Sequence, residues 1–585
     1  MRRTKIVCTL GPATNSVEKI KELILNGLDA ARINFSHGDH ESHAVTVNML
    51  KQAREELGAP IPLILDTKGP EIRIRKFKTE EVKLETGGNF TITTRDVEGD
   101  ESIVSVTYEG LPRDLEKGKR VLIDDGLVEL EVVSLSDTDI ECRIINGGVL
   151  SANKGVNIPD AKINLPSLTE RDINDIKFGI KMDFDYIAAS FIRCAADVIK
   201  IRNVLEQNGG GHIHIISKIE NREGVDNIDE ILEVSDGIMV ARGDLGVEIP
   251  IEEVPLVQKM LIKKANRSSK LVITATQMLE SMINNPRPTR AEANDVANAI
   301  FDGSDAIMLS GETAKGDYPV ESVATMARIA QKIESTIDYI KKLSVKPEKF
   351  MINTTNAISY AACSVAAELK VACIATVTKS GFTAKMISKF KPVCPVAASS
   401  YDPVVYRQLN LVWGCKPVLA DRVGDDNDIY DLAVETAVKA GLAKEGDSVV
   451  IAVGVPVGIS GTTNTIRVEM VGDIICEGIG VGTKSATGIA RVVKTLEEAE
   501  RIFRPGDIMV AEATTNELLP IMKKASAIVV GPVANEGNNH AEIVGRTLDI
   551  PVILCNAKIT NIIKDSSVIT VDAARGFIHE GLPDE

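Results

Sequence analysis

The sequence has few aromatic residues, no excess of positive charge and no long hydrophobic segment. Of its 585 residues 4% are aromatic and 26% are charged, and the net charge is -16. This acidic balance argues against nucleic acid as the main partner, because DNA and RNA bind basic surfaces. No apolar run reaches the roughly 18 residues of a membrane helix, and the start M-R-R-T-K-I-V lacks the apolar core of a signal peptide. We therefore expect a cytoplasmic protein that binds anions only at local sites.

The nine cysteines form no C-x-x-C pair. They are scattered from Cys8 to Cys555, and most of them have apolar neighbours. Zinc sites and redox motifs use cysteines at short, regular spacing. The pattern predicts reduced thiols in the core, and neither zinc ligands nor disulfides.

The chain is too long for one hydrophobic core, so about three to five domains are expected. From residue 4 a short apolar run, a polar tip and an amphipathic stretch recur eight times. Buried strands that alternate with helices pair in parallel, so this rhythm predicts a closed (β/α)8 barrel. A doubly wound open sheet is the alternative. The runs are 4–11, 29–38, 61–69, 186–192, 214–221, 237–244, 271–278 and 306–313.

Three further regions interrupt or follow this rhythm. Residues 72–164 alternate polar and apolar positions between glycine and aspartate turns, which predicts an inserted all-β domain. Because it leaves the barrel after the third strand, at the rim where barrel enzymes keep their chemistry, we interpret it as a lid. The barrel is then 1–71 and 165–345. Polar residues 341–350 precede an α/β domain at 353–472, and a glycine-rich domain at 473–585 ends the chain.

The stretch I-I-S-K-I-E-N-R-E-G (215–224) places Lys218 and Glu220 on one face of a predicted buried strand, because residues two apart share a face. An isolated pair of this kind is most often a surface salt bridge. In a parallel barrel, however, the polar tips of all strands meet at one mouth. The other tip residues are Arg32, Asn34, Ser36, His37, Asp66, Thr67, Lys68, Arg73, Arg242, Asp244 and Thr276.

These residue types predict a metal site beside an anionic ligand. Glu220 and Asp244 follow neighbouring strands, and two carboxylates with open coordination positions suit Mg²⁺ or Mn²⁺ better than zinc. Arg32, Lys218 and Arg73 supply the positive charge that phosphate and carboxylate oxygens need. The segment A-R-G-D-L-G (241–246) predicts a turn whose exposed backbone N–H groups cradle a carboxylate.

Six segments of the chain resemble the pyruvate kinase family in their residues and in their order along the chain. The resemblance covers residue 1 to about 472 and implies transfer of the phosphoryl group of phosphoenolpyruvate to ADP, giving pyruvate and ATP. It also implies dependence on Mg²⁺ (or Mn²⁺) and K⁺, and a homotetramer. The segments are R-I-N-F-S-H-G (32–38), L-D-T-K-G-P-E-I-R (65–73), I-I-S-K-I-E-N-R-E-G-V (215–225), V-A-R-G-D-L-G-V-E (240–248), T-A-T-Q-M-L-E-S-M (274–282) and M-L-S-G-E-T-A-K-G-D-Y-P (308–319).

The resemblance also implies roles for single residues. The divalent ion would be held by Glu220 and Asp244, and K⁺ by Asn34, Ser36, Asp66 and Thr67. The substrate would be contacted by Arg32, Lys218, Gly243, Asp244 and Thr276, of which Arg32, Lys218 and Thr276 are the catalytic residues. The nucleotide would be contacted by Asn34, His37, Arg73 and Lys154. Residue 71 is a glutamate, which resembles the family members that need K⁺; a lysine at this position goes with K⁺ independence.

The loop T-K-S-G-F-T-A (378–384) joins a predicted strand to a predicted helix, where hydroxyls and backbone donors can hold a phosphate. A plain turn is the alternative. The resemblance implies an allosteric pocket here for a sugar phosphate or AMP, closed by the loop G-I-S-G-T-T-N (458–464). The pocket residues would be Thr378, Lys379, Ser380 and Thr383.

Residues 536–553 resemble the phosphohistidine swivelling domain of phosphoenolpyruvate-utilising enzymes. In that family a threonine and a serine precede the histidine, whereas Asn538 and Asn539 precede His540 here. We therefore expect a structural addition and not phosphotransfer through His540.

Three other functions are alternatives. A dikinase or synthetase would need a reactive His540 and a nucleotide-grasp domain, which the sequence does not show. A metal-dependent lyase would share the Glu/Asp pair but would not need Arg32, the Asp66 cation site or a lid. An inert allosteric sensor would be expected to lack Lys218 or Glu220, and both are present.

Overall fold

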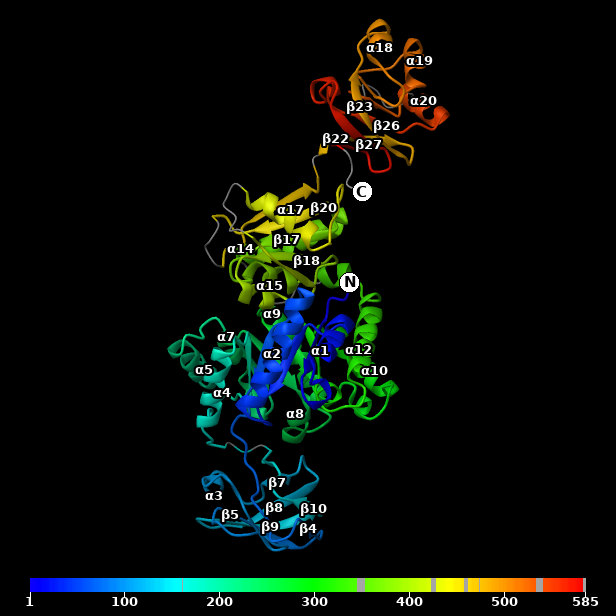
Figure 1. Cartoon of the computed structure of the whole chain (residues 1–585). Coiled ribbons are helices and arrows are strands. Elements are labelled where there is room, and N and C mark those ends of the chain that lie inside the picture. The colour runs from blue at the N-terminus through cyan, green and yellow to red at the C-terminus, as the bar shows by residue number, and fades with distance from the viewer. Residues whose placement is uncertain are drawn as a thin grey trace. The chain divides into compact units, whose positions relative to one another are not determined.

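Figure 1 shows the computed structural model, which describes residues 1–159, 161, 163–344, 353–421, 428–456, 461–472, 474–532 and 540–581. The chain divides into two compact units. The first comprises Met1–Ala367, Thr376–Asp426 and Val453–Asn464, and the second comprises Glu368–Ala375, Asn427–Ala452 and Thr465–Glu585.

Eight parallel strands close a barrel within the first unit, in the order β1-β16-β15-β14-β13-β12-β3-β2. The predicted (β/α)8 barrel is therefore confirmed, and the doubly wound sheet is excluded. The strands are β1 (Lys5–Thr9), β2 (Ala30–Asn34), β3 (Leu63–Asp66), β12 (Tyr186–Ala189), β13 (His214–Ile219), β14 (Gly237–Ala241), β15 (Leu271–Ala275) and β16 (Ala306–Leu309).

The barrel strands are apolar on both faces because each face packs on a different core. Val7, Ile64 and Ile216 point into the barrel and pack on one another. Their neighbours in sequence, such as Ile6 and Leu65, belong to the core between the barrel and its outer helices. This double burial explains the continuous apolar runs in the sequence.

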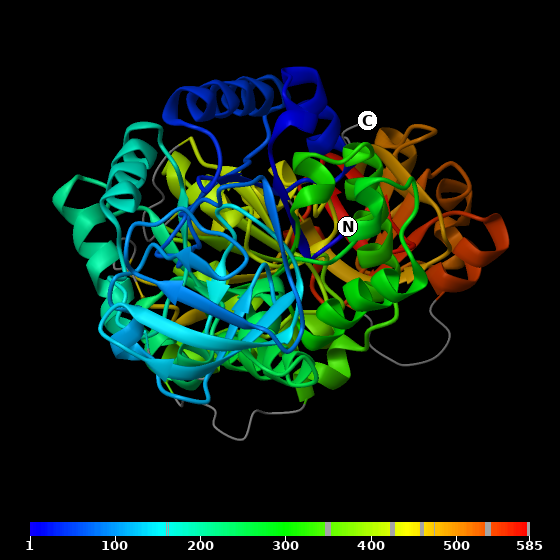
Figure 2. The same cartoon turned by 90° about the horizontal axis from the view of Figure 1, so that it is seen from below.

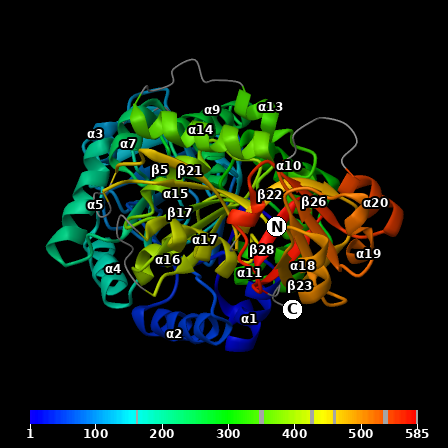
Figure 3. The same cartoon turned by 90° about the horizontal axis from the view of Figure 1, so that it is seen from above.

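The outer helices pack on the barrel through a shared hydrophobic core. Several begin at a side-chain cap that satisfies free N–H groups of the first turn; Ser16, Asp39, Thr169 and Thr289 act in this way. The helices are α1 (Val17–Asn26), α2 (His40–Leu57), α4 (Glu170–Lys181), α5 (Ala195–Gln207), α7 (Ile228–Val234), α9 (Val254–Arg267), α10 (Arg290–Asp302) and α12 (Pro319–Glu334). Figure 3 shows several of them, among them α2, α4 and α5, near the edge of the view.

The inserted region is a β domain with one short helix, α3 (Leu111–Asp114). Its main sheet has the order β11-β7-β8-β9-β5-β6, and β10 pairs with β4. Phe90, Ile92 and Leu130 belong to a core of its own, and Figure 2 shows the domain in blue and cyan. The strands are β4 (Glu81–Leu84), β5 (Asn89–Thr93), β6 (Ile103–Ser105), β7 (Arg120–Ile123), β8 (Val128–Leu135), β9 (Asp139–Asn146), β10 (Gly148–Ser151) and β11 (Val156–Asn157).

After α13 (Tyr339–Ser344) comes the predicted α/β region, a five-stranded sheet with the order β19-β18-β17-β20-β21. Residues 345–350 of the predicted boundary lie outside the described residues. The division into two units runs through this sheet. Its elements are α14 (Thr354–Leu369), β17 (Cys373–Val377), α15 (Phe382–Ser388), β18 (Val396–Ser400), α16 (Pro403–Leu409), β19 (Cys415–Leu419), α17 (Ile429–Lys439), β20 (Ser448–Val453) and β21 (Thr465–Met470).

The last region forms a second closed barrel, in the order β22-β26-β25-β24-β23-β27-β28. Helices on its outside pack on a core that includes Met509, Ile528 and Leu554. The elements are β22 (Ile474–Val481), β23 (Ser485–Val492), α18 (Leu496–Ile502), β24 (Ile508–Ala511), α19 (Leu519–Met522), β25 (Ala527–Val530), α20 (His540–Leu548), β26 (Val552–Cys555), β27 (Val568–Asp572) and β28 (Phe577–Glu580).

No helix among the described residues is long and apolar enough to cross a membrane. All nine cysteines are free thiols, and only Cys194 and Cys476 are not fully buried.

Candidate active site

The carboxyl ends of β2, β3 and β13 bring three charged groups together. Asp66 lies between two cations: its Oδ2 accepts a hydrogen bond from Arg32 Nε at 2.6 Å, and its Oδ1 lies 3.1 Å from Lys218 Nζ. Burial by itself raises the pKa of Asp66, but the charges of Arg32 and Lys218 outweigh it and hold the pKa below its ordinary value. Asp66 therefore stays ionised and holds both cations in place.

Lys218 is surrounded by acceptors. Its Nζ lies 2.9 Å from Glu220 Oε1 and donates to Ser190 Oγ at 2.8 Å. Burial lowers the pKa of Lys218, yet the nearby charges of Asp66 and Glu220 raise it by more, so the net shift is upward. The strand tolerates this lysine because its ammonium exchanges water for two carboxylates and a hydroxyl.

Ser190 and Phe191 were not singled out in the sequence, although they follow β12 in the run Y-I-A-A-S-F-I. The Ser190 hydroxyl donates to the carbonyl of Thr67 at 2.6 Å, and the backbone N–H of Phe191 donates to Glu220 Oε2 at 2.6 Å. Phe191 has a φ of 56°, which is uncommon for a bulky residue. Both residues directly follow a barrel strand, as Glu220 does, and this position is the signal in the sequence that could have identified them.

Glu220 and Asp244 form a pair of carboxylates on neighbouring strand ends. Burial raises the pKa of Glu220 to about 7; Lys218 opposes this shift and the negative charge of Asp244 adds to it. Among the described residues no group of three or more His, Cys, Asp or Glu side chains is arranged to hold a metal. Two carboxylates that repel each other are a donor set that suits a divalent cation with open coordination positions.

Asp244 lies in a helix, and not in the predicted turn. Residues Arg242–Glu248 form α8, and the Gly243 N–H donates to Thr276 Oγ1 at 2.8 Å. That donor is thus already used by a side chain, which corrects the expectation of a turn with exposed N–H groups. Arg242 fixes α8 by donating to the Thr276 carbonyl at 2.6 Å and to Asp295 Oδ1 at 2.7 Å.

Thr276 itself has a strained backbone. Its φ of 65° is rare for a β-branched residue, and such strain is held only where the surrounding contacts fix it. Its hydroxyl accepts from Gly243 and donates to the carbonyl of Ala275 at 2.7 Å.

The four residues predicted to hold a monovalent cation lie together. Asn34 is the register partner of Asp66 across β2 and β3, and Thr67 follows directly. The Asn34 Oδ1 accepts from the Ser36 N–H at 3.0 Å, which folds the loop back over the strand end. His37, in the same loop, is exposed to solvent.

A cavity of about 820 Å³ lies against Asp244 and the inserted domain. That volume is within the range of small-molecule sites. Two of the predicted nucleotide contacts, Arg73 and Lys154, line it, whereas Asn34 and His37 do not. Arg73 Nε donates to Glu71 Oε2 at 2.7 Å, and Lys154 Nζ lies 3.0 Å from Asp124 Oδ1.

The predicted effector loop lies between β17 and α15. Lys379 and Ser380 are exposed, whereas Thr378 and Thr383 are buried. The Thr383 hydroxyl lies 2.9 Å from that of Thr463, so the second predicted loop does reach the first. Residues 458–460 of that second loop lie outside the described residues.

His540 begins α20 in the C-terminal barrel. Both of its ring nitrogens have partners: Nδ1 lies 2.9 Å from Thr514 Oγ1, and Nε2 lies 3.1 Å from Asn516 Oδ1. Asn538 and Asn539 lie outside the described residues.

Comparisons with known proteins agree with this geometry. Three family descriptions match: "Pyruvate kinase, barrel domain" over residues 1–323, "Pyruvate kinase, alpha/beta domain" over 356–469, and "PEP-utilising enzyme, mobile domain" over 503–576. The pyruvate kinases of Geobacillus stearothermophilus and Bacillus licheniformis are 48% and 47% identical over 99% of each chain. A crystal structure of a pyruvate kinase from Cryptosporidium parvum superimposes with a TM-score of 0.76 at 39% identity, covering 80% of this chain and 96% of that one. The chain belongs to the pyruvate kinase family.

Proposed function

We propose that the site at the carboxyl ends of the barrel strands transfers the phosphoryl group of phosphoenolpyruvate to ADP, giving pyruvate and ATP. Family membership makes the chain a phosphotransferase. The observation that supports the reaction most directly is the buried group Arg32, Asp66, Lys218 and Glu220, in which two cations are fixed by carboxylates. Phosphoryl transfer needs positioned positive charge more than covalent chemistry.

We assign the substrate contacts to residues with fixed side chains. Arg32 and Lys218 hold the phosphoryl oxygens, and Lys218 also stabilises the charge that develops on the enolate oxygen. Because the pKa of Lys218 is raised, its ammonium keeps its proton and acts as a fixed charge. We assign the orientation of the substrate carboxylate to Thr276 and Gly243, which a hydrogen bond from the Gly243 N–H to Thr276 Oγ1 joins, and we assign help in protonating the enolate carbon to the Thr276 hydroxyl.

We assign the divalent ion, Mg²⁺ or Mn²⁺, to Glu220 and Asp244. When bound, it supplies positive charge to the carboxylate, enolate and phosphoryl oxygens of the substrate. Burial raises the pKa of Glu220, and the negative charge of the nearby Asp244 adds to that rise; a cation between the two carboxylates would relieve both effects, which supports the assignment. K⁺ is assigned to Asn34, Ser36, Asp66 and Thr67, and Glu71 supports a dependence on K⁺.

The nucleotide is assigned to Arg73 and Lys154, which line the cavity beside the inserted domain, and to Asn34 and His37, which do not line it. A phosphorylated effector, a sugar phosphate or AMP, is assigned to Thr378, Lys379, Ser380 and Thr383. The hydroxyl contact between Thr383 and Thr463 supports a pocket made by both loops. We also propose a homotetramer, by analogy with the family.

The test is pyruvate formation from phosphoenolpyruvate with Mg²⁺, with and without ADP and with and without K⁺. We expect turnover that requires ADP and rises with K⁺, and a loss on the order of 10² to 10⁴ in kcat, about 3–6 kcal/mol, for Lys218→Met. Lys51→Met, which removes a surface ion pair with Asp183, is the control and should change kcat less than twofold. Wild-type protein without turnover, or a Lys218→Met variant with full turnover, contradicts the proposal.

ADP independence would favour the metal-dependent lyase instead. The effector assignment has its own test, calorimetry with AMP, ribose 5-phosphate and fructose 1,6-bisphosphate on wild type and Ser380→Asp. The added carboxylate should abolish binding by repulsion. Unchanged binding of all three compounds by the variant would remove the assignment.

A further inference from the structure

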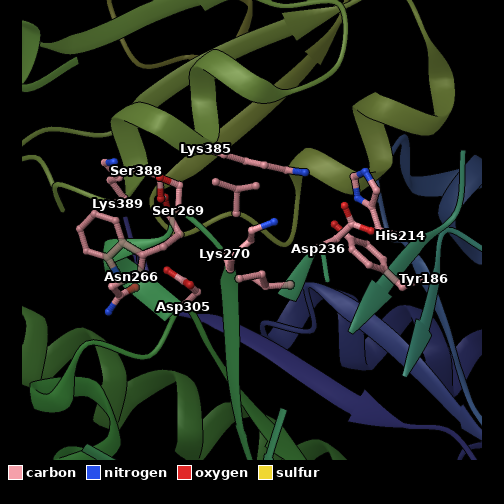
Figure 4. Close-up of a pocket in the computed structure, with 13 residues that line it drawn as sticks. Tyr186, His214, Asp236, Asn266, Ser269, Lys270, Asp305, Lys385, Ser388 and Lys389 are labelled. Carbon is pink, nitrogen blue, oxygen red and sulfur yellow. The ribbon is translucent and has the colours of Figure 1, made fainter. Parts of the chain in front are cut away.

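A second charged cavity lies between the amino ends of the barrel strands and helix α15 (Figure 4). It is separate from the candidate active site, which lies at the carboxyl ends of the same strands. Its barrel side is formed by Tyr186, His214 and Asp236, which begin or precede β12, β13 and β14, and by Lys270 before β15. Its other side carries Lys385, Ser388 and Lys389 from the end of α15 and the residue after it.

The carboxylates around this cavity are already paired with other groups. Asp236 Oδ2 lies 2.7 Å from Arg202 Nη2 and accepts from the Ile215 N–H at 2.9 Å. Asp305 forms an ion pair with Lys391. Asp236 attracts Lys270 and Lys385 electrostatically, but among the described residues it forms an ion pair with neither of them.

Lys385 is the lysine that lacks a partner. Its side chain extends across the cavity toward His214 and Asp236 in Figure 4. Within the part of the chain that the structure describes, Lys385 Nζ makes no hydrogen bond and no ion pair, although Asp236 attracts it electrostatically. A half-buried ammonium without a partner is costly, because burial removes the water that would solvate it.

The neighbouring basic groups are only partly satisfied. Lys270 Nζ donates to the carbonyl of Ser235 at 2.6 Å, a neutral acceptor, and Lys389 contacts the neutral amide oxygen of Asn356. The Nδ1 atom of His214 is buried and has no partner among the described residues. Burial lowers the pKa of Lys270 and of Lys385, and lowers the pKa of His214 to about 3. All of these groups would gain from a negative charge placed between them.

The size of the cavity limits what that charge can be. Its volume is about 30 Å³, which is room for about two or three water molecules. A compact oxyanion can replace those waters, whereas a nucleotide or a sugar phosphate cannot.

We propose that this cavity is a binding site for a small inorganic oxyanion of the phosphate or sulfate type, held by Lys385 and Lys270 with the His214 ring as a third donor. The site does not depend on the proposed reaction.

The position of the site links helix α15 to the barrel strands that carry the active-site residues. Lys385 lies on α15, two residues after Thr383 of the proposed effector loop. His214 begins β13, which carries Lys218 near its other end, and Lys270 leads into β15 and on to Thr276. A bound anion therefore ties α15 to the same strands that carry the active-site residues.

The chain supplies its own reporter for this site. Trp413 is its single tryptophan, lines the cavity and is 3% exposed. We would titrate the wild-type protein with sodium sulfate and with sodium phosphate, keep the ionic strength constant with sodium chloride, and follow tryptophan fluorescence. A saturable change with both oxyanions, absent with chloride alone, is expected.

Variants connect the response to the cavity. Lys385→Met should weaken the apparent sulfate affinity at least tenfold, and Lys270→Met should weaken it as well. Lys263→Met, an exposed lysine on α9, removes the same charge elsewhere and should leave the affinity within twofold. Ser380→Asp in the effector loop should also leave it unchanged, which separates the two sites.

A measurement on the wild-type protein does not depend on how the variants fold. The pKa of His214, followed by NMR of the imidazole, should rise when sulfate is added, because a bound anion favours the imidazolium. A parallel titration with ribose 5-phosphate should give a response that does not depend on Lys385. No saturable response to sulfate, an unchanged affinity in Lys385→Met, or a Lys385-dependent response confined to ribose 5-phosphate would each overturn the proposal.

Discussion

At the scale of single residues, the active-site geometry depends on how a buried ammonium is solvated. Lys218 touches two carboxylates and one neutral hydroxyl, that of Ser190. The two carboxylates keep the Lys218 ammonium charged. The Ser190 hydroxyl orients the ammonium, because Ser190 is itself fixed by a hydrogen bond to the Thr67 carbonyl. We therefore expect Ser190 to act as a positioning residue, through its contact with Lys218.

Removing the Ser190 hydroxyl should weaken catalysis without abolishing it. Ser190→Ala leaves both ion pairs of Lys218 in place and removes one charge-assisted hydrogen bond. We expect kcat to fall about tenfold, equivalent to about 1.4 kcal/mol, with a much smaller change in the KM for ADP. Steady-state kinetics of pyruvate formation measure this.

Ser217→Ala is the matched control for that change. Ser217 lies on β13 next to Lys218, is equally buried, and bonds to Ser235 at 2.7 Å, away from the ammonium. It should lower stability by about 1 kcal/mol and leave kcat within twofold. Equal effects of the two variants on kcat would show that the role of Ser190 is only structural.

The charged residues of the proposed site stand out in the sequence, whereas the neutral residues that orient them do not. Lys218 and Glu220 were visible because charge within an apolar strand is costly and needs a reason. Ser190 and the Phe191 N–H carry no such signal, since serine is common at strand ends and a backbone donor is invisible in a sequence. Their contribution follows from the register of β12 against β13.

At the scale of the elements, one glycine joins two neighbouring strand ends. Gly69 in the segment after β3 has a φ of 71°, and a Cβ there would lie 2.8 Å from both the Ser190 Cβ and the Phe191 ring. The close approach of these two segments therefore requires glycine.

Gly69→Ala should harm both stability and activity. We expect a loss of about 2–4 kcal/mol, from backbone strain and from steric overlap, together with a fall in kcat as Ser190 is displaced. Gly58→Ala is the control, because Gly58 has a similar φ of 58° but nothing within 4 Å of its Cβ position. Thermal unfolding and kcat measure the two variants, and equal losses would mean that strain alone is responsible.

The inserted β domain should be separable from the barrel. Arg73 and Gly155 form a bridge where the chain leaves and returns, so a short glycine-serine linker can replace residues 74–154. The barrel should remain folded, because the two regions have separate cores. Because Lys154 and one wall of the cavity are then missing, we expect kcat of pyruvate formation with ADP to fall at least 100-fold.

Two measurements decide this prediction. Circular dichroism should show a cooperative transition for the shortened chain, and calorimetry should show phosphoenolpyruvate binding within about tenfold of the full chain. A shortened enzyme with near-normal kcat would mean that the domain is no lid, and an unfolded barrel would mean that the cores depend on each other.

Element types followed from the sequence wherever the periodicity was strong. The eight barrel strands were recognisable because each is buried on two faces, and the inserted strands because they alternate. Helix α8 was not recognisable in the sequence, because R-G-D-L-G contains two glycines, which favour a turn over a helix. Its helical form is fixed by Arg242, which bonds to Asp295 on α10, and such a tertiary contact has no local signature.

At the scale of the whole molecule, the chemistry and the last domain lie in different compact units. Every residue of the proposed active site lies in the first unit, whereas β22 to β28 and His540 lie in the second. Within the second unit the C-terminal barrel contacts the α/β region through Glu445, whose carbonyl accepts from Arg575 Nη1 at 2.9 Å. His579 Nδ1 lies 3.4 Å from the Glu445 carboxylate.

A chain that ends at Gly472 should therefore retain catalysis. The cut follows β21, so the five-stranded sheet stays complete while the last barrel, which has its own core, is removed. We expect kcat within about threefold of the full chain, and a lower melting temperature because the contacts of Glu445 with Arg575 and His579 are lost. Steady-state kinetics and calorimetric melting of both chains test this.

His540→Ala in the full chain tests whether the last domain takes part in phosphotransfer through this histidine or acts without it. Because both ring nitrogens of His540 are occupied by Thr514 and Asn516, we expect no phosphohistidine after incubation with labelled phosphoenolpyruvate and no change in kcat. If His540→Ala lowers kcat as much as removal of the whole domain does, then the domain takes part in phosphotransfer. If removal of the domain alone lowers kcat while the melting of the barrel is unchanged, then it supports catalysis through a contact that does not involve this histidine.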